Sequence, residues 1–195
     1  MAESLINLQI KPEWFARSAD RVAPDLLGCT LVRQIEGISY RGLIVETEAY
    51  DATDPACHGY KRQTERNRAI FGQPGSLYVY LIYGIYHCIN IVCDRTDYCS
   101  AVLIRALDLD LIPEWVSEKE KRSRVAAGPG KLCRALQIDR SLNSLPLSLG
   151  SNIWIEPKAV DLEFSVVQTT RIGLTQGADI PWRWYIQNHP AVSKY

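Results

Sequence analysis

Residues 76–93 read SLYVYLIYGIYHCINIVC, two runs rich in β-branched and aromatic residues that meet at Tyr83–Gly84. Valine, isoleucine and tyrosine favour extended backbone, whereas glycine favours a turn. The stretch therefore predicts a β-hairpin with its tip at Tyr83–Gly84. A bend at this position would let the ring of Tyr83 project from the sheet.

Further extended runs lie on both sides of this hairpin. Residues 30–36 and 41–50, separated by GISY (37–40), predict a second hairpin, and residues 100–109 predict another strand. The remaining elements are helices expected at 11–19, 64–71, 112–124 and 128–138, and strands expected at 152–157, 164–174 and 181–187. Because strands come in blocks and do not alternate strictly with helices, we expect one mixed α+β domain over residues 1–195, with a largely antiparallel sheet.

The composition is that of an ordinary globular protein, with 47% hydrophobic and 23% charged residues in 195. No stretch approaches the roughly 20 consecutive apolar residues of a membrane span, and the first residues show no signal-peptide pattern. The six cysteines include no C-x-x-C pair, so we expect them to be reduced and mostly buried. These observations predict a cytoplasmic protein with no membrane association.

Basic and acidic residues balance, with 22 of each. This balance argues against binding nucleic acid by overall charge alone, but it is compatible with a local basic surface. Two basic runs occur, KRQTERNR (61–68) and KEKRSR (119–124), each with four basic residues and one acid. Such runs most often form a solvated surface, and contact with phosphate groups is the alternative.

Two carboxylates, Glu46 and Glu48, lie near the end of the strand predicted over residues 41–50. Residues two apart on a strand share a face and lie about 6.6 Å apart. Paired acids at such a spacing suit hydrolysis of a glycosidic bond through a water molecule. Acids at a strand end are more often simply solvated, so the pair alone leaves both interpretations open.

The hairpin of residues 76–93 carries tyrosines at positions 78, 80, 83 and 86. Tyr78 and Tyr80 are expected on one face of the sheet. Several aromatic rings beside a carboxylate suit the binding of a planar ligand, and nucleobases are bound by stacking and by contacts to their edges. Asn90 follows with a side chain that both donates and accepts hydrogen bonds. The alternative is a set of ordinary strand residues whose hydroxyl groups are bonded locally.

Several unusual segments occur in one order: VETEAY (45–50), the loop to His58, RQTERNRAIF (62–71), PGSLYVYLIYGIYHCIN (74–90), AVLIRAL (101–107), GPGKLCRAL (128–136) and RIG (171–173). With these segments the chain resembles the alkyladenine (3-methyladenine) DNA glycosylase family, in a compact bacterial form. The resemblance implies a curved, mostly antiparallel sheet with peripheral helices, without a helix-hairpin-helix motif, a metal or another cofactor. The activity that it implies is excision of alkylated or deaminated purines from duplex DNA, which leaves an abasic site.

The resemblance also implies which residues do the chemistry. Glu48, immediately before Ala49–Tyr50, is implied as the general base that activates water, and Arg105 as its partner in positioning that water. No chemistry is implied for Glu46, so we expect a Glu46→Gln change to be mild. The matched segments contain no activated lysine, so a monofunctional enzyme without a lyase step is expected.

A pocket for a flipped purine is implied by the same positions. Tyr50, His58 and Tyr80 would enclose the base, and Asn90 would lie at its edge. Tyr83, at the tip of the hairpin, would enter the minor groove and fill the space that the base leaves. The preferred lesion among 3-methyladenine, 7-methylguanine, hypoxanthine and ethenoadenine stays open.

Contacts to the DNA backbone are expected from the first basic run, through Arg62, Arg66 and Arg68. GPGKL (128–132) is not a nucleotide-binding P-loop, because it lacks the first glycine and the final serine or threonine. Its Lys131, near a helix start, is a further candidate for one phosphate contact, with simple helix capping as the alternative. The expected partner is duplex DNA with damaged purines, and the protein is expected to be a nucleoid-associated monomer.

His87, Cys88, Cys93 and Cys99 match no common metal-ligand spacing, so we expect no metal there. Two alternatives to a DNA glycosylase remain. One is a carbohydrate glycosidase that uses Glu46 and Glu48 as an acid–base pair. The other is a non-catalytic protein that binds damaged DNA with its aromatic rings, although such a protein needs neither Glu48 nor Arg105.

Overall fold

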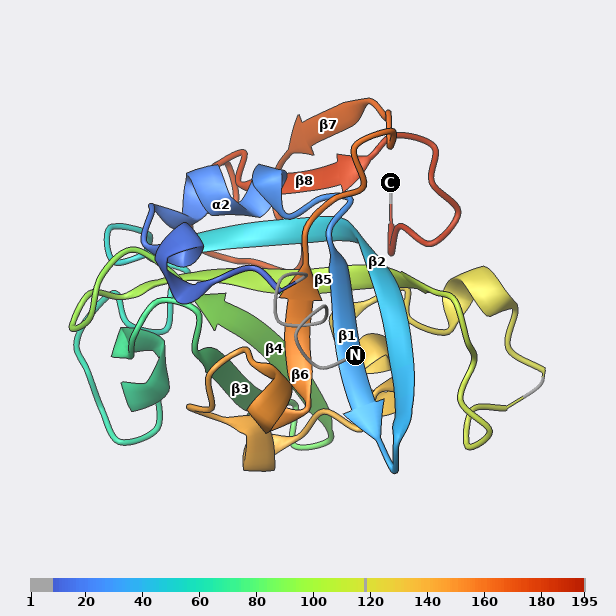
Figure 1. Cartoon of the computed structure of the whole chain (residues 1–195). Helices are drawn as coiled ribbons and strands as arrows, with labels where there is room; N and C mark the ends of the chain where they lie inside the picture. Colours follow the sequence, from blue (N-terminus) through green and yellow to red (C-terminus); the bar gives the residue numbers. More distant parts are fainter. Residues whose placement is uncertain (1–8, 118, 195) are drawn as a thin grey trace.

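One eight-stranded antiparallel sheet organises the computed structural model, which describes residues 9–117 and 119–194 (Figure 1). The strands are β1 (Thr30–Ile35), β2 (Ile38–Asp51), β3 (Leu77–Ile82), β4 (Tyr86–Val92), β5 (Ser100–Leu109), β6 (Ile153–Glu156), β7 (Val166–Thr169) and β8 (Arg183–Ile186). They are ordered β3-β4-β5-β2-β1-β6, and β8 pairs with both β2 and β7. The sheet is strongly curved, as the bend of β2 in Figure 1 shows.

The long strand β2 holds the sheet together because it changes neighbours along its length. One edge pairs with β5 from Gly42 to Asp51, while the other pairs first with β1, up to Leu43, and then with β8, from Glu46 to Glu48. The β2–β5 pairing shifts register on both sides of Glu46. Such irregularities bend a strand and redirect its side chains, so the curvature of the sheet and the region around Glu46 and Glu48 are linked.

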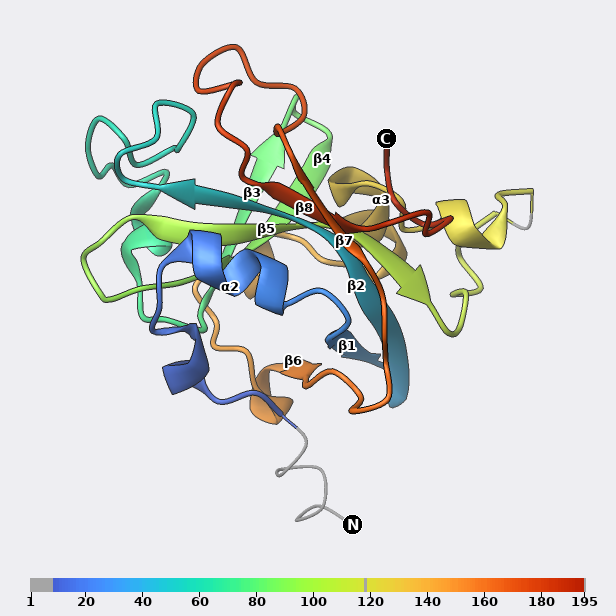
Figure 2. The same ribbon diagram turned by 90° about the horizontal axis from the view of Figure 1, so that it is seen from above.

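Two short α-helices pack against the sheet. Helix α2 (Ala19–Asp25) contacts β2, β5 and β8, and helix α3 (Pro129–Ala135) contacts β4 and β5 (Figure 2). Proline at the first helical position of α3 is favourable, because no N–H group is lost from a hydrogen bond there. The remaining helical segments are single 3₁₀ turns: η1 (Pro12–Phe15), η2 (Arg68–Phe71), η3 (Arg122–Arg124), η4 (Arg140–Leu142) and η5 (Leu149–Ser151).

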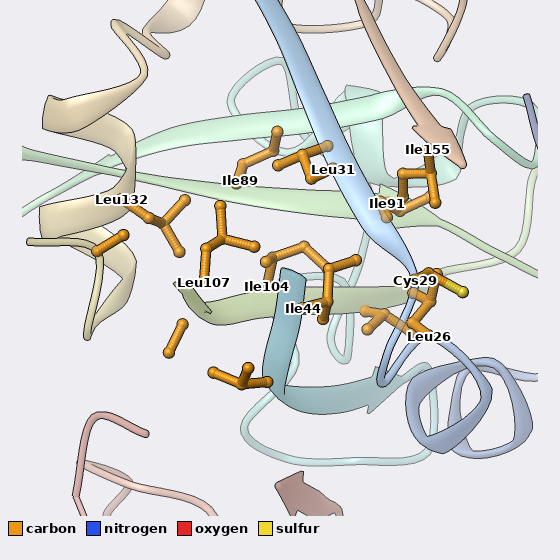
Figure 3. Packing of buried hydrophobic residues seen from close by; sticks show 14 of the residues in the cluster. Leu26, Cys29, Leu31, Ile44, Ile89, Ile91, Ile104, Leu107, Leu132 and Ile155 are labelled. Carbon is orange, nitrogen blue, oxygen red and sulfur yellow. The ribbon is translucent and has the colours of Figure 1, made fainter. Parts of the chain in front are cut away.

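The main core lies between the curved sheet and these helices (Figure 3). Ile44 of β2, Ile104 and Leu107 of β5, Ile89 of β4 and Leu132 of α3 are all almost completely buried in it. Burying each such side chain stabilises the fold by roughly 1.5–3 kcal/mol. The core therefore fixes β2, β4 and β5 relative to one another, and these strands carry Glu46, Glu48, Asn90 and Arg105.

The predicted fold class is confirmed: the described residues form one α+β domain with a curved antiparallel sheet. The hairpin of residues 76–93 is present as β3 and β4. All six cysteines are free and buried, as expected. None of the helices in the described ranges is long and apolar enough to cross a membrane.

Four local predictions were wrong. The helix expected at 11–19 is only the 3₁₀ turn η1, and α2 begins where that prediction ended, at Ala19. Residues 112–124 form only η3 at their end, and Trp115 instead donates its indole N–H to Ala135 O of α3. The predicted helix 64–71 is helical only from Arg68, because the Asn67 side chain accepts hydrogen bonds from the Thr64 backbone and closes a turn. The turn between β1 and β2 is Glu36–Gly37, both with positive φ, so residues 38–40 already belong to β2.

Candidate active site

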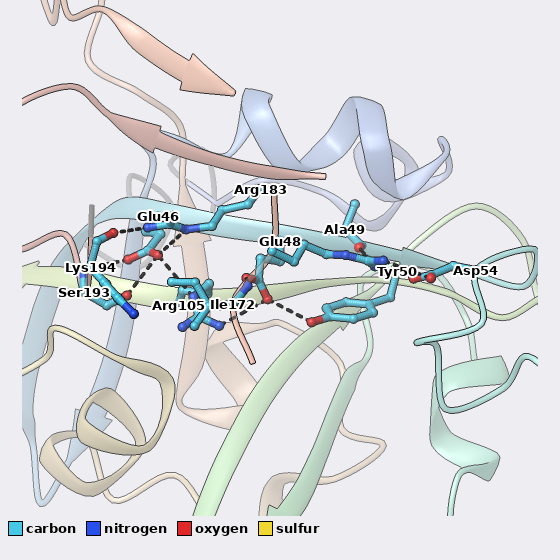
Figure 4. Close-up of polar contacts among 11 residues, drawn as sticks. Glu46, Glu48, Ala49, Tyr50, Asp54, Arg105, Ile172, Arg183, Ser193 and Lys194 are labelled. Carbon is cyan, nitrogen blue, oxygen red and sulfur yellow. Dashed lines mark hydrogen bonds and ion pairs between the residues drawn. The ribbon is translucent and has the colours of Figure 1, made fainter. Parts of the chain in front are cut away.

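Arg105 lies at the irregular point of the β2–β5 ladder, where Ala106 pairs with Glu46 and Ile104 pairs with Thr47. The ladder skips Arg105, and its side chain reaches both acids of β2. Arg105 Nε donates to Glu46 Oε1 at 3.1 Å, and Nη1 donates to Glu48 Oε2 at 3.2 Å (Figure 4). Burial alone would lower the pKa of Arg105, but the carboxylates of Glu48 and Glu46 outweigh it, so the pKa is raised and the guanidinium stays charged.

Glu48 is fully buried and accepts three hydrogen bonds from the described residues. Tyr50 Oη and Arg105 Nη1 donate to Oε2, and the backbone N–H of Ile172 donates to Oε1 at 2.8 Å. A carboxylate has about four acceptor positions, so one position on Oε1 has no donor among the described residues. Burial and then the charge of Glu48 raise the pKa of Tyr50, so its hydroxyl group remains a donor.

Glu46 is also fully buried, which contradicts the expectation of a solvated acid at a strand end. Its Oε1 accepts from Arg105 Nε, from Arg183 Nε at 2.8 Å and from Ser193 Oγ at 2.9 Å. Its Oε2 accepts from the Ser193 backbone N–H at 2.7 Å. Within the described chain, Oε1 therefore accepts three hydrogen bonds and Oε2 accepts one. The two acids differ in their partners: Glu48 is bound by Tyr50, Arg105 and Ile172, whereas Glu46 is bound mainly by Arg183 and Ser193.

Arg171 holds the wall beside Glu48 in place. It forms a fully buried ion pair with Asp54, donates to Ala49 O at 2.9 Å, and lies 4.7 Å from the ring centre of Tyr50. Burial lowers and the Asp54 hydrogen bond raises the pKa of Arg171, with a net upward shift. Since Ile172 follows directly, this anchoring fixes the N–H group that binds Glu48. Sequence reasoning missed Arg171, although RIG (171–173) was among the matching segments.

A pocket of about 300 Å³ opens in front of this acid. Six predicted site residues line it together: Tyr50, His58, Tyr80, Tyr83, Asn90 and Arg105. Glu48 lies behind the pocket wall, bonded to three residues that form the wall. A larger depression of about 750 Å³ near residues 63–76 is more open and includes only Arg68 of the predicted residues. The smaller pocket is therefore the candidate site, because the three residues bound to Glu48 line it.

One wall of the pocket is a group of aromatic rings in mutual contact. The ring centres of His58 and Tyr80 are 4.5 Å apart, and those of Tyr78 and Tyr80 are 5.3 Å apart. Rings this close leave no space for another ring between them, so the open part of the pocket lies between this group and the other lining residues, Tyr50 among them. Tyr78 Oη is 2.8 Å from His58 Nδ1 and orients the imidazole. Burial and then the charge of Arg66 lower the pKa of His58, which keeps the ring neutral near pH 7.

Tyr83 lies at the tip of the β3–β4 hairpin with a positive φ of 53°, followed by Gly84 with a φ of 74°. These turn angles place the ring outside the sheet, where it is 83% exposed. Ile85 and Tyr86 beside it are also exposed. The predicted projection of Tyr83 is confirmed, and its ring lies at the rim of the pocket.

The first basic run forms an exposed loop next to the pocket. Arg62, Arg66 and Arg68 are exposed, and Arg68 contacts Glu65 at 3.4 Å. Asn67 is buried beneath them and donates to His58 O at 2.7 Å and to Arg62 O at 3.0 Å. The Asn67 amide therefore connects the basic loop to His58, which lines the pocket.

The second basic run is largely occupied by contacts within the protein. Arg122 donates to Leu109 O, and Arg124 donates to Val192 O at 2.6 Å. Lys131 Nζ pairs with Glu120 at 2.6 Å and also donates to Arg124 O. The proposed phosphate contact of Lys131 stays a prediction, and it would have to compete with Glu120. No group of three or more potential metal ligands occurs among residues 9–117 and 119–194.

The chain is similar to known proteins over most of its length. The family model described as methylpurine-DNA glycosylase matches residues 13–190. A relative from Synechococcus sp. (strain JA-3-3Ab) is 56% identical over 94% of this chain and 98% of its own length. Relatives from Trichodesmium erythraeum and Carboxydothermus hydrogenoformans are 51% and 43% identical over 96% and 93% of this chain, and over 98% and 97% of their own lengths. Each is assigned by its name as a 3-methyladenine DNA glycosylase. The chain belongs to the methylpurine-DNA glycosylase family.

Proposed function

We propose that this DNA-repair glycosylase turns an alkylated or deaminated purine out of duplex DNA and hydrolyses its N-glycosidic bond with water activated by Glu48. The observation that carries the proposal is the contrast between the two acids of β2. The three residues that donate to Glu48 all line the aromatic pocket, whereas Arg183 and Ser193, which supply three of the four donors to Glu46, do not. A single general base is therefore supported over an acid–base pair.

The reaction creates positive charge on the sugar and negative charge on the departing base. A buried carboxylate orients the attacking water, accepts its proton and stabilises the cationic sugar. Tyr50 and Arg105 donate to Oε2 of Glu48, which leaves the unfilled position on Oε1. Because Ile172 N–H fixes Oε1, the position of the water is defined before the substrate binds.

The pocket suits purines that carry a positive charge. Electron-rich tyrosine rings attract cations, and the neutral imidazole of His58 does not repel them. Arg171 covers one face of Tyr50, so only the other face remains for the base. Asn90 Nδ2 donates to Tyr78 O at 3.1 Å, which directs the amide along the pocket wall. Damaged bases also pair weakly, so turning them out costs less than for normal bases.

Excision assays on duplex oligonucleotides test this function. Four substrates are needed, each with one 3-methyladenine, 7-methylguanine, hypoxanthine or ethenoadenine, together with an undamaged duplex. We expect release of at least one damaged base and an abasic product without strand cleavage, since the proposed chemistry uses water and no lysine. Binding without release from all four would support a non-catalytic damage-binding protein. We propose that the enzyme acts as a monomer in the compartment that contains the DNA.

The Tyr83→Ala variant tests base flipping. The ring is exposed at the hairpin tip, so its removal should change folding stability by less than about 0.5 kcal/mol. Excision from duplex DNA should fall much more than excision from the same lesion in a single strand, where no stack has to be filled. Single-turnover rates on both substrates measure this difference. If the excision rate falls equally on duplex and single-stranded substrates, Tyr83 acts within the pocket and does not fill the space that the base leaves in the duplex.

Alanine variants of Lys61, Arg62, Arg66 and Arg68 test the DNA-facing role of the basic loop. If a side chain contacts a phosphate, its loss should weaken binding to all sequences alike and lower the slope of log affinity against log salt by about one. Binding titrations at several salt concentrations measure the slope. Arg21 on α2 is exposed and its helix contributes nothing to the pocket, so Arg21→Ala is the control. Unchanged slopes in all four variants would show that these side chains contact no phosphate group and that the loop is simply a solvated surface.

A further inference from the structure

Glu46 lies in the same buried network as Glu48 without lining the pocket (Figure 4). It connects three parts of the chain that are far apart in sequence. Arg105 comes from β5, Arg183 comes from β8, and Ser193 comes from the segment that follows β8. A buried charge with four hydrogen bonds to three residues is costly to disturb, so these contacts fix the position of each partner.

Residues 190–194 are held in place by Arg124 and Arg183. Arg124 donates to Pro190 O at 3.1 Å, to Val192 O at 2.6 Å and to Ser193 O at 2.9 Å. Arg183 donates to Lys194 O. Ala191 and Val192 are buried. The segment is therefore a bound part of the domain, and its Ser193 supplies two of the four donors to Glu46.

We propose that Glu46, together with residues 190–194, is a support that positions Arg105 for Glu48. This inference rests on the proposed roles of Glu48 and Arg105. The guanidinium of Arg105 is planar and rigid, so a bond at Nε fixes the direction of Nη1. Glu46 binds Nε and Glu48 binds Nη1. Glu46 is a positioning residue: it sets the angle at which Arg105 meets the carboxylate, and Ser193 and Arg183 hold Glu46 at that angle.

The Glu46→Gln variant tests the support, with Glu156→Gln as its matched control. Glu156 is likewise a buried acid bonded to an arginine, Arg41, but it lies on β6 and outside the pocket. Both variants should lose folding stability. The sequence alone led us to expect a mild effect of Glu46→Gln, but its buried contact with Arg105 changes that expectation. Only Glu46→Gln should lower the single-turnover excision rate at saturating enzyme, on the order of 10²-fold, because a small misplacement of a catalytic group has an effect of that size. Affinity for lesion DNA should stay unchanged, which a purely structural defect would not predict.

A double-mutant cycle shows whether Glu46 acts through Arg105. In an Arg105→Gln background, Glu46→Gln should lower the rate by much less than in the wild type, because the group that it positions is gone. Full additivity of the two changes would overturn the proposal. So would a Glu46→Gln rate equal to that of Glu156→Gln.

A second pair of variants, which leaves Glu46 itself unchanged, tests the proposal if Glu46→Gln does not fold. Arg124 and Arg122 lie in the same 3₁₀ turn and both donate to backbone carbonyls, Arg124 to residues 190–193 and Arg122 to residues 109–110. Arg124→Ala should reduce the excision rate and Arg122→Ala should not. Equal rates in the two variants would contradict a role for residues 190–194. A fully active Glu48→Gln would instead show that the proposed role of Glu48, on which this inference rests, is wrong.

Discussion

The Glu48→Gln variant is expected to bind lesion-containing duplex DNA about as well as the wild type and to excise the damaged base on the order of 10²–10⁴-fold more slowly. This loss corresponds to about 3–5 kcal/mol of transition-state stabilisation. Glutamine keeps the shape of the side chain and one carbonyl oxygen, which can still accept from Ile172 N–H. It cannot take a proton from water, and it offers no full negative charge to the cationic sugar.

The measurement is a single-turnover excision rate combined with a binding titration on the same lesion duplex. The amide also cannot satisfy both Tyr50 and Arg105 at Oε2 as the carboxylate does, so thermal unfolding of the variant has to be recorded as well. A rate loss in a folded, binding-competent variant supports Glu48 as the general base. A rate within a few fold of the wild type would assign the proton transfer elsewhere.

The Asp54→Asn variant is expected to lose about 3–5 kcal/mol of folding free energy, which is typical when one partner of a buried ion pair is removed. Both side chains of the Asp54–Arg171 pair are fully buried, so the guanidinium would be left in the interior without a counter-charge. Chemical denaturation measures the loss as a lower midpoint in urea. Because Arg171 anchors Ile172 beside Glu48, excision should also slow in the fraction that remains folded.

Asp25→Asn is the matched control, since Asp25 pairs with Arg17 at the surface with side chains 52% and 37% exposed. Exposed pairs contribute only about 0.2–1 kcal/mol. Neutralising both partners, in Asp54→Asn with Arg171→Gln, should be less harmful than Asp54→Asn alone, because no unpaired charge is buried. If Asp54→Asn and Asp25→Asn cost the same, the buried pair does not anchor the Arg171 loop.

The local sequence was sufficient wherever neighbouring residues decide the structure. The β3–β4 hairpin follows from two β-forming runs around Tyr83–Gly84, and its turn angles explain why Tyr83 is exposed. Tyr78 and Tyr80 share a face because they are two apart on a strand. Residues 112–124 were wrongly predicted as a helix. Their side chains bind distant segments of the chain, and helical propensity contains no information about such contacts.

The sequence by itself determined the fold class and the hairpin, and the family resemblance that it carries named six of the residues that line the pocket. The strand pattern alone did not distinguish Glu46 from Glu48, because both acids lie on the same face of one strand. The resemblance named Glu48, and only the tertiary structure shows how the surroundings of the two acids differ. Their difference depends on donors that arrive from distant positions: Ile172 for Glu48, and Arg183 and Ser193 for Glu46. The burial of a charge and the number of its remaining acceptor positions are properties of packed segments, so they exist only once the chain has folded.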